Sequence, residues 1–394
     1  MTTDVVLVEG VRTAIGRFGG ALSPLSASDL GAAVIREVLR RANLEPAQVD
    51  EVVIGCVGQV AEDAYIARTS SIKAGLPKEV PAYAVNRLCS SGLQSIVSAG
   101  QAIRLGEAEV VVAGGVESMS NFPYFVRQAR FGYRMGHGTL EDGLIVTLSD
   151  PFRRYHMGVT AENVAERWGI DRTAQDQVAL RSQQRMAEAM RAGLFRDQIV
   201  PVTVQDRKGE RVVDTDEHPR PDTTLEQLAS LKPSFKEGGT VTAGNSSGIN
   251  DGAAAVVVMS SDKARTLGLR PRLVLRAAAA AGVEPEYMGI GPVPAVRKAL
   301  ARAGLTLSDI DLIELNEAFA AQAEAVVRDL GLDWDRVNVN GGAIAHGHPV
   351  GATGAILTVK LMYEMERRGA RYGLVTMCIG GGQGLAAVFE NPAA

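Results

Sequence analysis

The sequence predicts a layered α/β fold, and three observations lead to this prediction. Short apolar runs, typical of strands buried on both faces of a sheet, alternate with segments whose apolar residues recur at helical spacing. Of the 394 residues, 46% are hydrophobic and 22% are charged, the composition of an ordinary globular protein of two or three domains. Part of the first half also recurs in the second half, as in a duplicated α/β unit.

The first 118 residues alternate between strand and helix patterns. Apolar runs predict strands at 5–8, 49–54, 80–85 and 109–115. Ser28 and Asp29 are expected to cap a first helix that runs through Leu39. Another helical pattern begins just after Cys89. This order of elements is typical of a sheet covered by helices.

The character of the sequence changes between residues 119 and 249. Aromatic and arginine residues enter, strand signals fade, and helical patterns at 160–168 and 173–191 are joined by long polar loops. Basic and acidic residues are equal in number here, whereas the rest of the chain carries the acidic surplus. We interpret 119–249 as an inserted loop domain and the better place for a polyanionic ligand.

The second half repeats part of the first. Residues 41–44 and 49–54 match residues 302–305 and 310–315 at a constant offset of 261. We therefore expect an N-terminal half at 1–268, which includes the insertion, and a C-terminal half at 269–394. The same offset carries Cys89 to Val350 in a glycine-rich turn. Packed face to face, such halves would bring these two turns to a shared cleft.

Composition also excludes several classes of function. A net charge of −4 without a basic run argues against nucleic-acid and membrane-surface partners. No apolar run is long enough to span a bilayer, and the first residues do not resemble a secretory leader. Three widely spaced cysteines fit neither a disulfide framework nor a zinc site, so we expect no metal and a reducing, cytoplasmic location.

Cys89 lies at a strand-to-helix junction, which is a chemically suggestive position. A helix N-terminus presents unpaired N–H groups and partial positive charge, which stabilise a thiolate and can hold an oxyanion. The small residues Ser90, Ser91 and Gly92 let a substrate approach the backbone. A buried structural cysteine would have the same local sequence, and this stretch alone leaves both interpretations open.

The second half supplies three more candidates. Asn316 ends a buried strand, His348 lies in the glycine-rich turn, and Cys378 ends a strand before a run of glycines. An amide can orient a water, and an imidazole can act as a base or as a donor to an oxyanion. Singly, each has a structural explanation, as a helix cap, a turn histidine or a buried strand cysteine.

These candidates belong to five motifs that together resemble the thiolase family over the whole chain. The motifs are NRLCSSG at 86–92, GGVESMS at 114–120, NEAFA at 316–320, GHPVGATG at 347–354 and CIGGGQG at 378–384. The resemblance implies a five-layered α/β/α/β/α duplication of two related halves, with an inserted loop domain that binds coenzyme A (CoA). It also implies acyl-CoA substrates, no permanently bound cofactor, and a homotetramer or homodimer.

The resemblance implies a role for each reactive residue. Cys89 would be the nucleophile that carries the acyl group, His348 would activate it, and Cys378 would be the acid/base at the α-carbon. Asn316 would hold a water that completes one oxyanion hole with His348. The N–H groups of Cys89 and Gly380 would form the other. Claisen chemistry needs this set, since it requires a covalent acyl donor, a second base and two oxyanion sites.

The CoA contacts implied by the resemblance lie mainly in the insertion. His156, Met157 and Ser247 match pantetheine contacts of the family, and Arg220 is expected to approach the adenosine end. Met288 lies where relatives line the acyl pocket. The activity implied is that of a short-chain acetyl-CoA acetyltransferase with some breadth. A degradative 3-ketoacyl-CoA thiolase for longer chains, in fatty acid metabolism, is the alternative.

The sequence argues against three other classes of protein. A ketoacyl-carrier-protein synthase pairs its cysteine with two histidines, whereas Cys378 stands here at the position of the second base. A dinucleotide oxidoreductase lacks support, because no Gly-x-Gly-x-x-Gly opens a helix after the first strand. A non-catalytic acyl-CoA-binding protein would be expected to lose a reactive residue. His346 adds a second imidazole near His348, and we expect it to face solvent.

Overall fold

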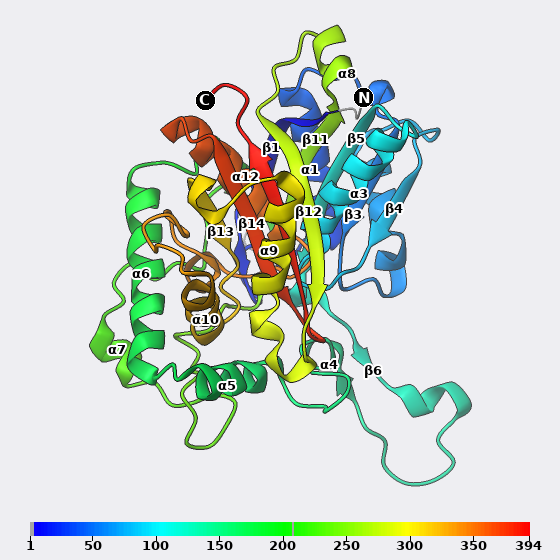
Figure 1. Cartoon of the computed structure of the whole chain (residues 1–394). Helices are drawn as coiled ribbons and strands as arrows, with labels where there is room; N and C mark the ends of the chain where they lie inside the picture. The colour runs from blue at the N-terminus through cyan, green and yellow to red at the C-terminus, as the bar shows by residue number, and fades with distance from the viewer. Residues whose placement is uncertain (1–3, 207–208) are drawn as a thin grey trace.

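The computed structural model describes residues 4–206 and 209–394, in which eleven strands form one mixed sheet (Figure 1). Its main path runs in the order β13-β14-β15-β12-β1-β11-β5-β3-β4. The strands on this path are β1 (Val5–Thr13), β3 (Glu51–Gly55), β4 (Ala82–Val85), β5 (Val110–Ser118), β11 (Asn250–Ser260), β12 (Leu273–Gly282), β13 (Leu312–Leu315), β14 (Tyr372–Ile379) and β15 (Gln383–Glu390). Two short strands join at the side, β2 (Gly16–Arg17) on β11 and β8 (Ile199–Val200) on β1.

The sheet consists of two halves with the same strand order. The order β1-β11-β5-β3 in the first half corresponds to β12-β15-β14-β13 in the second. Within the sheet, the described strands of the two halves are joined where β1 pairs antiparallel with β12, over two residue pairs. This repeated order confirms the duplication that the sequence predicts.

The duplication extends to individual hydrogen bonds. Asp50, just before β3, accepts hydrogen bonds through its carboxylate from two backbone N–H groups at the start of β5, at 2.8 and 2.9 Å. Asp311, just before β13, accepts from two N–H groups at the start of β14, at 2.8 and 2.9 Å. Each carboxylate therefore fixes the register of a neighbouring parallel strand in its own half.

Helices complete a five-layered arrangement. They are α1 (Ala27–Arg41) and α2 (Ile66–Ala74) outside the first half-sheet, α3 (Ser91–Leu105) and α12 (Thr353–Arg368) between the half-sheets, and α9 (Pro292–Ala303) and α10 (Ala320–Leu330) outside the second. Alternate strand residues face different layers: Val111 of β5 packs with α3, whereas Val112 packs with α1. Strands buried on both faces explain why the sequence shows continuous apolar runs.

The insertion leaves the sheet after Ser118 and returns at Asn250, beside its starting point, since Ser118 pairs with Asp251. It contains α4 (Gly143–Thr147), α5 (Met157–Trp168), α6 (Arg172–Arg191), α7 (Leu225–Ala229), β6 (Tyr124–Phe125), β7 (Glu141–Asp142), β9 (Val202–Asp206) and β10 (Gly209–Val213). Helices α5 and α6 pack against α10 of the second half. The segment around β6 and β7 projects from the body as an arm (Figure 1). The β9–β10 hairpin was not predicted from the sequence.

The cap of α1 differs from the expectation. Ser26, not Ser28, precedes the first turn, and its hydroxyl accepts a hydrogen bond from the Asp29 N–H at 3.1 Å. The Asp29 carboxylate in turn accepts from the Ser26 N–H at 3.2 Å. A capping box needs a spacing of three residues, which Ser26 and Asp29 provide and adjacent residues cannot.

The central helices α3 and α12 approach each other closely at their N-termini. A Cβ added to Gly92 would lie 2.8 Å from the Ala355 nitrogen and 2.9 Å from the Gly351 carbonyl oxygen. Both atoms belong to backbone and cannot rotate away. Glycine at 92 therefore sets how near the turn before α3 comes to the turn before α12.

We expect Gly92→Ala to reduce the free energy of unfolding by about 1–3 kcal/mol, the usual cost of overpacking. Gly100→Ala on the same helix is the matched control, because its Cβ would meet the flexible ends of Leu275 and Val5. Alanine also gains about 1 kcal/mol of helix propensity at either site. Thermal and urea unfolding measure both effects. Equal stability of the two variants would contradict the close contact.

Candidate active site

The turn that carries Cys89 has an unusual backbone. Leu88 adopts a left-handed conformation with φ of 47°, which is rare for a residue with a side chain. The Asn86 side chain accepts a hydrogen bond from the Leu88 N–H at 2.9 Å, and the Ser91 hydroxyl donates to the Leu88 carbonyl at 2.7 Å. These bonds hold the turn that delivers Cys89 to the N-terminus of α3. Its side chain stays partly exposed, whereas Cys56 and Cys378 are buried.

The Cys89 thiol faces two backbone donors. The N–H groups of Gly380 and of Cys89 itself lie near the sulfur and favour its ionised form. Burial outweighs them and raises the pKa of the thiol, so Cys89 rests as a thiol. The expected stabilisation of a thiolate is therefore present but smaller than the cost of burial. Two convergent N–H groups remain available for negative charge that develops beside the sulfur.

The His348 ring is fixed in one tautomer. Its Nδ1 lies 2.6 Å from the Thr353 hydroxyl, which itself donates to the Pro349 carbonyl at 2.9 Å. The hydroxyl proton is thus engaged, so Nδ1–H is the donor and Nε2 carries the lone pair. Burial lowers the pKa of His348 to about 4, which keeps the ring neutral at pH 7. A neutral imidazole with an unprotonated Nε2 is a proton acceptor.

Asn316 stands against this imidazole. It follows β13, and its N–H donates to the Thr376 carbonyl at 3.0 Å. Its Nδ2 lies 3.3 Å from His348 Nε2, and its Oδ1 is buried without a donor among the described protein groups. The expected helix does not begin here but at Ala320. Asn316 therefore presents one amide donor beside the histidine and one free acceptor, as a water-holding residue needs.

Cys378 is buried near the end of β14. Burial raises the pKa of its thiol well above the usual value, and the nearby charge of an ionised Cys89 raises it further. Two residues later, a Cβ at Gly380 would lie 3.3 Å from the Met157 methyl group and 3.4 Å from a Leu88 methyl group. The two cysteines, Gly380 and Met157 therefore share one site.

An apolar cluster adjoins Cys378. Met288 is buried in it, and Met157 packs at its edge; its other members are Ala161, Val241, Phe235, Ala318 and Phe319. His156 stacks on Phe235, with ring centroids 4.7 Å apart and planes 11° apart. Burial lowers the pKa of His156. The structure thus brings His156, Met157 and Met288 to the cysteines.

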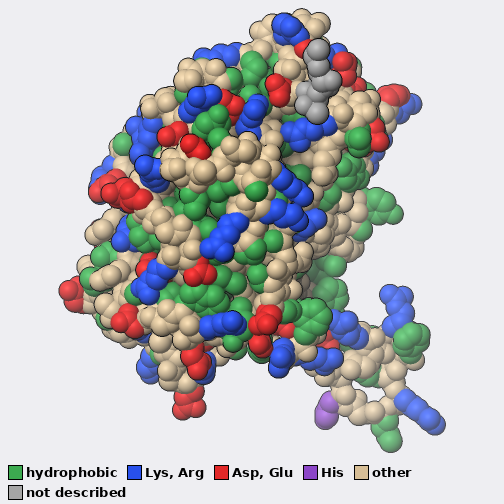
Figure 2. Space-filling model, in the orientation of Figure 1, with side chains coloured by type: hydrophobic (Ala, Val, Ile, Leu, Met, Phe, Trp, Pro, Cys, Tyr) green, Lys and Arg blue, Asp and Glu red, His purple; other side chains and the backbone are tan. Residues whose placement is uncertain are grey.

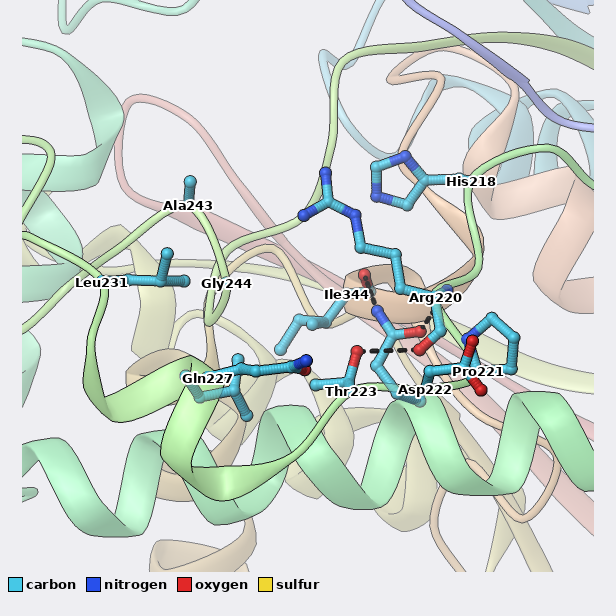
Figure 3. A pocket seen from close by; sticks show the side chains of 12 residues that line it. His218, Arg220, Pro221, Asp222, Thr223, Gln227, Leu231, Ala243, Gly244 and Ile344 are labelled. Carbon is cyan, nitrogen blue, oxygen red and sulfur yellow. Dashed lines mark hydrogen bonds between the residues drawn. The ribbon is translucent and has the colours of Figure 1, made fainter.

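A cavity of about 350 Å³ lies between α6, α7 and the loops of the insertion (Figure 3). Arg220 and His218 line it together with Ala243 and Gly244 from the run that contains Ser247. Burial and the charge of Arg220 lower the pKa of His218 to about 4. Ser247 does not line this cavity; its N–H donates to the Ala318 carbonyl at 3.0 Å, next to the apolar cluster.

The expectation that His346 faces solvent is wrong. Its side chain is 1% exposed, because it belongs to the short helix α11 (Ala343–His346), which packs against α6. Its Nδ1 donates to the Gly347 carbonyl at 2.8 Å, and burial lowers the pKa of the ring well below its usual value. His346 is a neutral, buried group.

Two side chains that hold His348 were missed from the sequence. Thr353 fixes the ring, as described above, and Asn250 accepts a hydrogen bond from the His348 N–H at 2.9 Å. Asn250 lies at the start of β11, 98 residues away in sequence. Thr353 is only five residues from His348 and so was a local candidate, whereas nothing local identifies Asn250.

Two kinds of feature, a metal site and a membrane-spanning helix, have no candidate in the described part of the chain. Among residues 4–206 and 209–394, no group of three or more His, Cys, Asp or Glu side chains could hold a metal ion. In the same part of the chain, no helix is long and apolar enough to cross a membrane.

Comparisons with known proteins cover both halves. Family models described as "Thiolase, N-terminal domain" and "Thiolase, C-terminal domain" match residues 5–262 and 269–391. Beta-ketothiolase BktB of Cupriavidus necator is 55% identical over 99% of this chain and 100% of its own length. The crystal structure of the Bacillus anthracis acetyl-CoA acetyltransferase superposes with a TM-score of 0.98 at 48% identity, covering 99% of each chain. Human mitochondrial 3-ketoacyl-CoA thiolase in complex with CoA gives a TM-score of 0.95 at 46% identity, covering 99% of this chain and 98% of its own.

We expect Thr353→Val to slow the alkylation of Cys89 by iodoacetamide at pH 7 by about tenfold or more. The variant removes the acceptor of the His348 Nδ1–H, and an unpaired buried group costs about 1–3 kcal/mol. Thr358→Val is the matched control, since the Thr358 hydroxyl donates only to the Gly354 carbonyl of the same helix. If both variants react like the wild type, the hydroxyl does not set the state of His348.

Proposed function

This chain belongs to the thiolase family, and from that premise we propose how its own residues perform the chemistry. It is a short-chain acyltransferase that joins two acyl-CoA molecules by Claisen condensation or, in reverse, cleaves a 3-ketoacyl-CoA with CoA. One observation supports the assignment of residues: Gly92, just after Cys89, lies against the Gly351 carbonyl of the His348 turn, and Cys378 is close enough to Cys89 to respond to its charge. A covalent acyl transfer with a second acid/base group needs a nucleophile, its base and that group close together.

The first half of thiolysis is carried by Cys89. His348 Nε2 removes the Sγ proton, and the sulfur attacks the 3-keto carbon of the substrate. Charge develops on the keto oxygen, where the N–H groups of Cys89 and Gly380 donate hydrogen bonds. The bond between C2 and C3 then breaks, and C2 takes a proton from the Cys378 thiol. Acetyl-CoA leaves, and the acyl group remains on Cys89 as a thioester.

The second half returns the acyl group to CoA. The Cys378 thiolate removes the proton of a CoA thiol, and the CoA sulfur attacks the acyl carbon on Cys89. Cys89 leaves and regains its proton from His348. The raised pKa of Cys378 supports its role as a resting acid, because it holds its proton until the carbanion forms. The His348–Asn316 pair, with a water on Asn316 Oδ1, would stabilise the enolate oxygen.

We propose that CoA is a substrate held along the path from the cysteines to the Arg220 cavity. His156, Met157 and Met288 are beside Cys378, Ser247 is next to the same apolar cluster, and Arg220 offers a cation for phosphate. CoA has a flexible thiol-bearing chain and an adenosine diphosphate end. The chain needs an apolar channel, and the diphosphate needs basic residues at the entrance of that channel. The three free thiols also support a reducing, cytoplasmic location.

We propose in addition that the chain is a homotetramer. The projecting arm exposes large apolar side chains, with Phe131 95% and Met135 97% accessible. Figure 2 shows hydrophobic and basic side chains together on the segment that projects from the body. Such a segment is stabilised when a second copy covers it.

Thiolysis of 3-ketoacyl-CoA substrates of increasing chain length tests the function. We expect the wild type to cleave acetoacetyl-CoA, with kcat/KM falling as the chain lengthens. Cys89→Ala should lose about four orders of magnitude or more in kcat, because the nucleophile is gone. Thermal stabilisation by CoA is the control for binding by this variant. A preference for long chains would favour the degradative alternative, and CoA binding without cleavage by the wild type would indicate a binding protein.

Sedimentation velocity tests the assembly. We expect a wild-type tetramer that a Phe131→Asp, Met135→Asp double variant reduces to a smaller species, since buried charge is unfavourable in an interface. Leu105→Asp, another exposed apolar residue but on the end of α3, is the matched control. A monomeric wild type, or an unchanged double variant, would contradict the proposal.

A further inference from the structure

Glu117, in the motif at 114–120, has no role in the steps above, yet its carboxylate joins segments from both halves. Oε2 accepts hydrogen bonds from the N–H groups of Val57 and Gly351, at 3.0 and 2.8 Å. Oε1 accepts from the Gly58 N–H at 2.9 Å. Val57 and Gly58 follow β3 in the first half, whereas Gly351 lies three residues beyond His348 in the second.

This carboxylate is unfavourable to bury. Glu117 is 1% exposed, and burial raises its pKa to about 7 although three backbone N–H groups oppose the shift. Its hydrogen-bond partners are those N–H groups and the Cys56 thiol at 3.6 Å. Buried carboxylates usually face a cation, so stability alone does not account for this one.

The two segments held by Glu117 enclose the reactive turn. Val350, beside Gly351, is buried in a small apolar cluster against which both Cys89 and Val57 pack. A side chain at Gly351 would collide with the Glu117 carboxylate, so only glycine permits this contact. The negative charge of Glu117 also contributes to the raised pKa of Cys89, which agrees with its closeness to the thiol.

We propose that Glu117 is a positioning residue for the acyl transfer. Its carboxylate ties the Gly351 end of the His348 turn to the Val57–Gly58 turn and so sets the imidazole relative to the Cys89 thiol. This inference rests on the proposed function. Glu117 touches no reacting atom and acts through the two turns that it joins.

Glu117→Gln and Glu117→Ala test this role in thiolysis of acetoacetyl-CoA by the full chain. The glutamine oxygen can still accept from Val57 and Gly351, but its NH₂ group opposes the Gly58 N–H. We expect kcat to fall about tenfold in the glutamine variant and about a hundredfold or more in the alanine variant. KM for CoA should stay within about twofold in both, because CoA binding does not use this carboxylate. Single-turnover acetylation of Cys89 by acetyl-CoA should slow by the same factors.

Asp50→Ala is the matched control, since Asp50 also accepts two backbone N–H groups, at the opposite end of β5. It should lower the melting temperature and leave kcat unchanged. A kcat of Glu117→Gln that lies between those of Glu117→Ala and the wild type supports a positioning role. If Glu117→Ala does not fold, the kcat of Glu117→Gln alone tests that role. The inference would be overturned if the Glu117 variants lost no more kcat than Asp50→Ala does at a similar loss of melting temperature. A raised KM with unchanged kcat in the Glu117 variants would also overturn it. An inactive wild type would instead refute the proposed function.

Discussion

The site depends on the close approach of two helix N-termini that come from different halves of a duplicated fold. Helices α3 and α12 meet where glycines replace side chains, with Gly92 against the Gly351 carbonyl and the Ala355 nitrogen. Cys89 lies just before one helix and His348 in the turn before the other. The segments that follow Cys89 and His348, distant in sequence, meet because backbone can touch backbone there. The layers outside this contact mainly hold the two helices in place.

Burial keeps the reactive groups neutral at rest. It lowers the pKa of His348 to about 4 and raises the pKa of both Cys89 and Cys378. The N–H groups of Cys89 and Gly380 do not outweigh the effect of burial on the pKa of the resting Cys89 thiol. They are well placed for a transition state, in which charge forms briefly in a medium that screens it little. A neutral site that stabilises charge only as it develops is suited to covalent acyl transfer.

The sequence was sufficient for the architecture and for naming candidate reactive residues, because both leave local signals. Strands buried on both faces appear as apolar runs, and the duplication appears as a constant offset. Several specific contacts between distant segments were not predicted. The burial of His346 depends on packing by α6, and the hydrogen bond from the His348 N–H to Asn250 joins residues 98 apart in sequence. The sequence showed Glu117 only as a member of the motif at 114–120, since its hydrogen-bond partners lie in two other segments. The cap at Ser26 was missed although the three-residue spacing to Asp29 is local.

In the proposed mechanism, Cys89 carries the acyl group. Peptide mass spectrometry of the wild-type protein, after acid quenching of a reaction with acetyl-CoA alone, tests this step. We expect one acetyl group, on the peptide that contains Cys89, which disappears when CoA is added. An acetyl group on Cys378 or Cys56 instead, or an unmodified protein that still cleaves acetoacetyl-CoA, would contradict it.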